Sequence, residues 1–380
     1  MLVSPPLPRR LPAVPQPAAV ESFFSWVDHL GHSYEVDRAS MMRALGLAQR
    51  NRPAPARDLI RYTMRMSEDA GRAVRAATGL AGSDLFFMTL PYLDMCYGYG
   101  RRSSRRPKET WAFCPQCLAP EGRWPLWWYE RWAAACPVHR CYLISRCPHC
   151  GTPFTPERTA SHRGESGRCW GFGDAPASGR PPAALRKHCG TRLWEIDTKP
   201  VRDPAVLHAV ERLRDSVTPP ALHTLGSCLS TYRVLDTLLD RQVVRVRSFH
   251  SPDPLLRRRF ASQRSAARGR GDNFSGFLDP RNMTADGIDD SLRDPISRAC
   301  RLSVIGRILT SDNMSATAHD LLEILRSTNA NTSFIPQYQG AQPARPDLDG
   351  FLRAVFDQGA PYSSEHRTPQ PPPPRRPPVT

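Results

Sequence analysis

The stretch FCPQC (residues 113–117) is followed by CPVH (residues 136–139) and then by CPHCG (residues 147–151). Each of these motifs places two Cys or His side chains at a spacing of two intervening residues. That spacing puts two ligand atoms on one edge of a tetrahedron around zinc. Gly151 closes the last motif, and glycine accepts the positive φ of a knuckle turn without steric cost. The segment therefore predicts a small zinc-ribbon β module at the centre of the chain.

The first predicted zinc site takes its ligands from the first two motifs. Three thiolates and one imidazole make a complete tetrahedral set. A complete set of protein ligands leaves no position for a reacting water, so the site is predicted to be structural. Its ligands are Cys114, Cys117, Cys136 and His139.

The second predicted zinc site is less regular. Cys147 and Cys150 supply one knuckle, but Phe172 stands where a second ligand pair would continue from Cys169. The residues after Cys169 have the Gly- and Pro-rich composition of an insertion. We predict the ligand set Cys147, Cys150, Cys169 and Cys189, with His188 as the competing fourth ligand. Two zinc ions per chain are expected in all.

Tryptophan is concentrated in this segment, with seven of the eight tryptophans between residues 111 and 194. A zinc module has little core of its own, and large aromatic side chains supply much of the area that it buries. We predict that these rings form core. A surface on which bases stack is the alternative. The isolated cysteines are expected to be small core residues: Cys96, Cys141, Cys228 and Cys300.

The apolar residues outside the zinc segment recur at helical spacing, as in Phe23, Phe24, Val27 and Leu30. We therefore predict a mainly α protein with a small zinc-ribbon β module. Its expected parts are a disordered arm (1–17), a helical, helix-turn-helix-like domain (18–100), a double zinc-binding domain (108–197), a helical C-terminal region with a flexible segment at 251–300 (200–335), and a Pro-rich disordered tail (336–380).

Several local signals support the helical N-terminal domain. Ser22, Ser67 and Ser83 are candidate N-caps, and Gly79 is a candidate helix end. A helix, a short glycine-containing turn and a second helix form the outline of a helix-turn-helix. Packing within a helical bundle, or contact with a protein, is the other interpretation of this outline.

The chain is strongly basic, with a net charge of +16, and the excess is concentrated in residues 96–200. Such a charge favours a polyanionic partner such as nucleic acid, although the Arg-rich composition of a GC-rich genome gives a similar bias. The linker before the zinc segment contributes most densely. Its candidate phosphate-contacting residues are Arg101, Arg102, Arg105, Arg106 and Lys108. A solvated linker is the alternative for these side chains.

Other classes of protein are disfavoured. The first twenty residues are broken by prolines, and no run of apolar residues is long enough to cross a bilayer. We therefore expect a cytoplasmic protein without a membrane partner, in which clustered cysteines bind metal. The chain contains no HExxH motif, paired acidic cluster or glycine-rich phosphate loop, so we do not expect an enzyme.

The order of these motifs resembles a known family. FCPQCL, an aromatic spacer, CPVH, CPHCG and a closing Cys–Gly are similar to the zinc segment of TniQ proteins, and ESFFSWVDHLG (residues 21–31) is similar to their opening helix. The second site departs from the family pattern, because Arg186 stands where a cysteine before Cys189 would be expected.

This resemblance implies a transposition accessory protein. Such a protein would link target DNA, or an RNA-guided target complex, to the AAA+ ATPase regulator of a transposon and through it to the transposase. A homodimer is left open. The alternative is a zinc-stabilised, DNA-binding transcription regulator that uses the same two modules.

Overall fold

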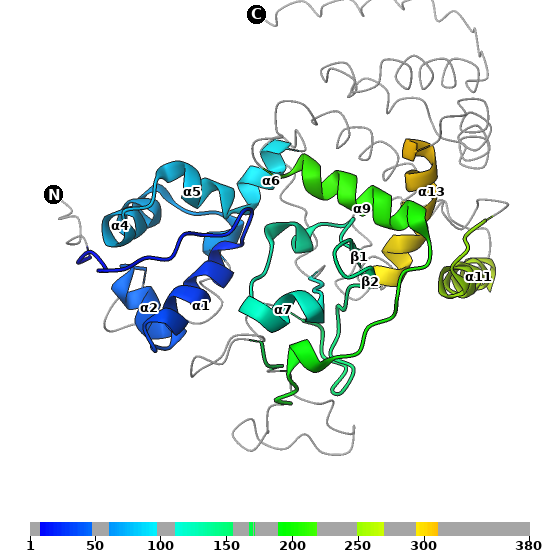
Figure 1. Ribbon diagram of the computed structural model, residues 1–380, viewed down its shortest axis with the longest axis horizontal. Coiled ribbons are helices and arrows are strands. Elements are labelled where there is room, and N and C mark those ends of the chain that lie inside the picture. Colours follow the sequence, from blue (N-terminus) through cyan, green and yellow to red (C-terminus); the bar gives the residue numbers. More distant parts are fainter. Residues whose placement is uncertain are drawn as a thin grey trace, which may run out of the picture.

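The structure, a computed structural model, describes residues 8–47, 61–96, 111–154, 167–169, 171, 189–218, 249–269 and 294–310. In this part of the chain the protein is mainly helical, with a single two-stranded sheet (Figure 1). The predicted fold class is therefore confirmed. None of the described helices combines the length and the hydrophobicity that a membrane crossing needs. The predicted Pro-rich tail at 336–380 lies outside the described residues.

The N-terminal part consists of short helices. They are α1 (Phe23–Ser33), α2 (Arg38–Ala44), α4 (Glu68–Thr78), α5 (Gly82–Phe87) and α6 (Leu90–Cys96). Helix α2 packs against α1, and α5 lies between α4 and α6. The apolar stripe predicted for the first helix is buried along the whole of α1. Asp37 caps α2 and Ser67 caps α4 through their side chains, whereas Ser22 makes no side-chain cap. Gly79, with φ of 77°, ends α4 as predicted.

The α4–α5 corner has the outline of a helix-turn-helix. The amide of Ala81 donates to Asp84 at the start of α5, so the predicted cap Ser83 lies inside the helix. Helix α5 carries no basic side chain, and Gly82 and Ser83 are its exposed residues. This corner therefore offers no arginine or lysine from α5 to a phosphate or a base.

The N-terminal arm is ordered over residues 8–17, where we expected disorder. The amide of Leu11 donates to the carbonyl of Ala77 at 2.7 Å. The hydroxyl of Tyr34 donates to the carbonyl of Ala13, and the indole N–H of Trp26 donates to Pro15. In Figure 1 the arm runs between the α1–α2 pair and the α4–α5 pair. The expectation fails because backbone groups of this Pro-rich segment find hydrogen-bond partners on α4, on α1 and at the C-terminal cap of α1.

The zinc segment contains little regular structure. Its elements are α7 (Pro115–Glu121), the 3-10 helix η1 (Leu126–Tyr129), the strands β1 (Ala135–Cys136) and β2 (Cys141–Tyr142), and the 3-10 helix η3 (Leu193–Glu195). The strands form an antiparallel hairpin in which Cys136 pairs with Cys141. The tryptophans of this segment fill its interior, and Trp128 and Trp132 are each only 1% exposed. The prediction that these rings form core is confirmed for the five tryptophans from 111 to 132, all of which are buried.

A buried joint fixes the zinc segment to the start of α1. The Glu21 carboxylate, 1% exposed, accepts hydrogen bonds from the Ser25 hydroxyl at 2.7 Å and from Arg123 at 3.2 Å. The Ser25 hydroxyl in turn accepts from the amide of Trp124, and the amide of Ser22 donates to the Trp124 carbonyl. The polar residues of the ESFFSW stretch therefore hold the two parts of the molecule together.

Three longer helices follow: α9 (Pro204–Ser216), α11 (Pro254–Gly269) and α13 (Pro295–Thr310). Helices α9 and α13 lie against the zinc segment, and α11 packs against α13 (Figure 1). The backbones of α9 and α13 pass very close to each other at Gly306. Any larger residue at this position would place its Cβ atom against the carbonyl oxygen of Ala205.

We predicted that residues 251–300 form a flexible segment. This prediction is wrong for residues 254–269 and 295–300, because both stretches are helical. The Arg- and Ser-rich composition of the segment suggested a linker, but Leu256 and Phe260 give α11 a buried stripe.

A buried polar network ties these helices to the hairpin. The Asp203 carboxylate accepts hydrogen bonds from the hydroxyls of Ser251 and Ser303, each at 2.6 Å. Asp253 accepts from the hydroxyl of Tyr142 in β2, also at 2.6 Å. Both carboxylates are almost completely buried, so each depends on these donors to offset the loss of hydration. The network therefore sets how α9, α11 and α13 sit on the zinc segment.

Candidate metal centres

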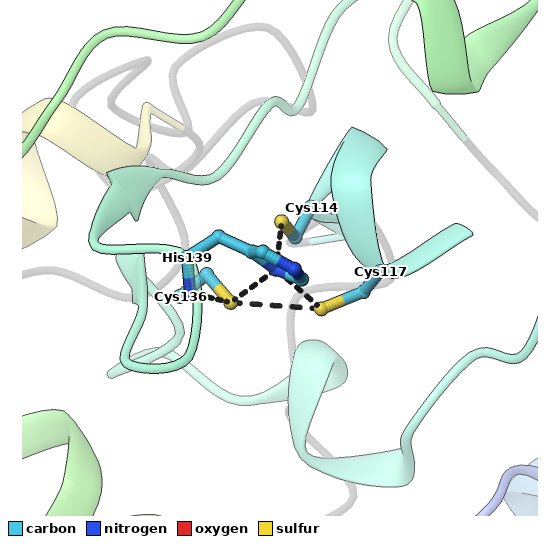
Figure 2. Close-up of side chains that lie close together, drawn as sticks. All are labelled: Cys114, Cys117, Cys136 and His139. Atoms are coloured by element: carbon cyan, nitrogen blue, oxygen red, sulfur yellow. Dashed lines mark hydrogen bonds between the residues drawn. The ribbon is translucent and has the colours of Figure 1, made fainter. Parts of the chain in front are cut away.

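The first cluster brings together two structural elements (Figure 2). Cys114 is the N-cap of α7, Pro115 occupies its first turn, and Cys117 follows within that turn. Cys136 ends β1 and His139 lies in the turn before β2. The helix start and the hairpin thus each contribute two ligand atoms to one point.

The four ligand atoms of this cluster are close to tetrahedral spacing. The Cys117 and Cys136 sulfurs are 3.6 Å apart. The Nδ1 atom of His139 lies 3.4 Å from the Cys114 sulfur and 3.2 Å from that of Cys117. A tetrahedral zinc site with Zn–S bonds of about 2.3 Å requires sulfurs roughly 3.8 Å apart. The amide of His139 also donates to the Cys136 sulfur, a bond that stabilises a thiolate.

The thiols of the first cluster cannot all ionise without a cation. The pKa of Cys114 lies far above its ordinary value, because its thiol hydrogen-bonds to Cys117 and Cys136 and is buried. Hydrogen bonds from Cys114 and Cys117 lower the pKa of Cys136 to about 2. The Cys136 sulfur is therefore the one that carries a negative charge, which the thiols of Cys114 and Cys117 stabilise by hydrogen bonds. A metal ion would remove the remaining protons, so its binding is coupled to proton release.

Cys141 was expected to be an ordinary core residue, and it is buried as predicted. However, its sulfur lies 3.6 Å from that of Cys114. This proximity was missed at the level of sequence. It follows from the hairpin register, which pairs Cys141 with the ligand Cys136. Cys141 is therefore a hydrogen-bond neighbour of the cluster.

The second cluster joins the turn at Cys147–Cys150 to Cys169 and Cys189. The sulfurs of Cys147 and Cys189 are 3.7 Å apart, and those of Cys150 and Cys169 are 3.6 Å apart. Gly151, with φ of 67°, follows the first pair as the sequence pattern requires. Burial raises the pKa of Cys147 and of Cys169. This cluster too would therefore lose protons to solvent when it binds a metal ion.

The irregular spacing of the second cluster has a simple geometric basis. The amide of Cys169 donates to the Thr191 carbonyl, and the amide of Gly190 donates back to the Cys169 carbonyl. The amide of Cys189 donates to Gly171. Two paired backbone segments therefore replace the usual knuckle. Their pairing brings Cys169 and Cys189 together whatever the length of chain between them.

Both predicted ligand sets are brought together, each with its ligand atoms within 4.8 Å of one another. Sets of three thiolates with one imidazole, or of four thiolates, match the donors and the geometry that zinc prefers. Each set is complete in itself and leaves no ligand position open. Either cluster could therefore hold a metal ion in a closed, structural site.

Some predicted site residues lie outside the described residues. They are the candidate phosphate contacts Arg101, Arg102, Arg105, Arg106 and Lys108, and the competing ligand His188. Cys189, which we preferred as the fourth ligand, lies in the second cluster. The role of the basic linker stays a prediction.

Comparison with known proteins agrees with the resemblance seen in the sequence. The TniQ family model matches residues 12–143. No curated protein matches the chain. The matched segment runs from the ordered arm through the helical part and the buried joint to the hairpin of the first metal centre. Over residues 12–143 the chain is therefore similar to the TniQ family, and this similarity suggests a protein associated with transposition.

Proposed function

We propose that this protein is a targeting adaptor of a transposon, which links target DNA or a target-bound complex to an AAA+ ATPase regulator and, through it, to the transposase. The observation that carries the proposal is the TniQ match over residues 12–143. An adaptor needs surfaces held in a fixed relation to each other. The joint formed by Glu21, Ser25 and Arg123 supports such a relation between the helical part and the zinc segment.

We further propose that both clusters hold zinc. The spacing of their ligand atoms fits this ion, and zinc supplies no redox chemistry of its own. In this role the metal would add to the aromatic core of a segment whose two strands are each only two residues long. Cys114 and Cys117 would tie α7 to the hairpin, and Cys147 and Cys150 would tie the following turn to residues 169 and 189. The metal would thus contribute to folding rather than to catalysis.

The adaptor role is tested by co-purification. The zinc-loaded full-length chain is mixed with the AAA+ ATPase of a transposon that carries this gene, with ATP and with DNA in turn. The proposal expects a complex with the ATPase that survives gel filtration. Failure to form it under any of these conditions would contradict the adaptor role, and binding of a promoter fragment with repression of transcription would favour a regulator instead.

A further inference from the structure

Helix α11 (Pro254–Gly269) has a composition that its packing does not explain. Its sixteen residues include five arginines and no aspartate or glutamate. The helix lies beyond the TniQ match at 12–143. In Figure 1 it stands at the edge of the molecule, next to α13 and far from α1 and α2.

One face of α11 is firmly seated. Leu256 is completely buried, and Phe260 stacks on Phe249 with ring centroids 4.4 Å apart. Arg259 is bound to α13, since its guanidinium pairs with Asp294 at 2.9 Å and donates to the Ser297 hydroxyl. These contacts fix the rotation of the helix about its axis and therefore determine which residues face solvent.

The opposite face carries exposed arginines and small side chains. Arg257 and Arg258 are exposed, and the next residues on the same side are the exposed Ala261, Ser262 and Ser265. These positions are three or four apart and so form one stripe. The guanidinium of Arg257 donates to the Ser251 carbonyl, which orients it. Within the described part of the chain no carboxylate pairs with Arg258.

We propose that this face of α11 binds the phosphate backbone of duplex DNA. That this duplex is the target DNA rests on the adaptor function proposed above. Arginine and serine are donors that commonly contact phosphates, and the major groove is wide enough for an α-helix. The small side chains of Ala261, Ser262 and Ser265, which follow the two arginines, allow close approach. The stripe has no aromatic ring for stacking unpaired bases. It also has no large apolar side chain, of the kind that forms the core of a protein interface.

The test compares two charge reversals in the zinc-loaded full-length protein. Arg258→Glu changes the proposed face. Arg212→Glu is the matched control, because Arg212 is also an exposed helical arginine, on α9, with Glu211 and Asp215 beside it. Both changes alter the net charge equally. Affinity for a duplex of arbitrary sequence is measured by fluorescence anisotropy at several salt concentrations, and circular dichroism and zinc content verify the fold.

Loss of one phosphate contact lowers the slope of log K against log salt by about 0.9, which corresponds to roughly tenfold in affinity at 50 mM salt. We expect at least this loss for Arg258→Glu and a change of about twofold or less for Arg212→Glu. Equal losses in both variants, no duplex binding by the parent protein at low salt, or tighter binding of single strands would each overturn the proposal. Binding of the AAA+ ATPase is measured in parallel, so a failure of the adaptor function is recognised separately.

Discussion

The buried joint gives the sharpest test of how the two parts of the TniQ segment are held together. Replacing Glu21 by alanine removes the acceptor of the Ser25 hydroxyl and of Arg123. The carboxylate is 1% exposed, whereas the Arg123 side chain is 24% exposed and would recover part of its hydration. Breaking a buried charge pair costs about 3–5 kcal/mol. With the arginine partly hydrated, we expect Glu21→Ala to destabilise the joint by roughly 2–4 kcal/mol.

Hydrogen exchange measures this effect locally. The amides of Ser22 and Trp124 bond across the joint, and a loss of 2 kcal/mol would make them exchange roughly 30-fold faster if the joint opens locally. The control is Asp69→Ala, which breaks an exposed pair with Arg72 and should cost less than about 1 kcal/mol. Equal effects of the two changes, or unchanged exchange at both amides in Glu21→Ala, would refute the role assigned to the joint.

Three further outcomes follow from the centres and from the C-terminal helices. Metal analysis should give two zinc ions per chain, about one in Cys189→Ser and still two in Cys300→Ser; two ions in Cys189→Ser would exclude that residue as a ligand. Burial opposes ionisation of Asp253, but the hydrogen bonds to its carboxylate outweigh burial and lower its pKa in the folded protein. The ionised carboxylate therefore contributes to stability above the unfolded pKa of about 4, and this contribution is lost as pH falls through the lower folded pKa. Asp253→Asn should flatten that acid limb of the unfolding curve, and an unaltered limb would contradict this. Gly306→Ala should destabilise the protein by at least about 1–3 kcal/mol, because its Cβ meets the backbone of α9, whereas Gly82→Ala should be close to neutral; similar unfolding midpoints for both would argue against the close crossing.

The sequence was most informative where a few residues decide a local structure. The CxxC and CxxH spacings predicted the two clusters, because ligand geometry constrains neighbours in sequence directly. The fourth member of the second cluster was harder. Cys189 depends on backbone pairing between residues 169–171 and 189–191, and no local spacing encodes such a pairing.

The segments predicted as arm and linker show where composition misleads. Proline and arginine content suggested that residues 8–17 and 254–269 lack fixed structure. However, Leu11 finds a backbone partner on α4, and Leu256 and Phe260 give α11 a buried stripe. A small number of apolar residues at the right spacing is sufficient to order a helix against a neighbour. That neighbour is distant in sequence, so composition alone could not reveal it.

The joint was visible in the sequence only as a family pattern. The ESFFSW stretch predicted a helix, and α1 confirms it. The pattern did not show that Glu21 and Ser25 face Arg123 and Trp124, about a hundred residues away. Such a contact between polar side chains requires the tertiary structure.

The central claim is that this chain serves transposition as an adaptor, and a reconstituted transposition reaction tests it most directly. The transposase, the AAA+ ATPase, donor DNA and target DNA are combined with and without the zinc-loaded protein, and junction products are counted by sequencing. The account predicts that targeted insertions require the protein and that the Glu21→Ala variant, with its joint opened, supports fewer of them. Equal numbers of insertions at the same sites with the protein omitted would contradict the claim.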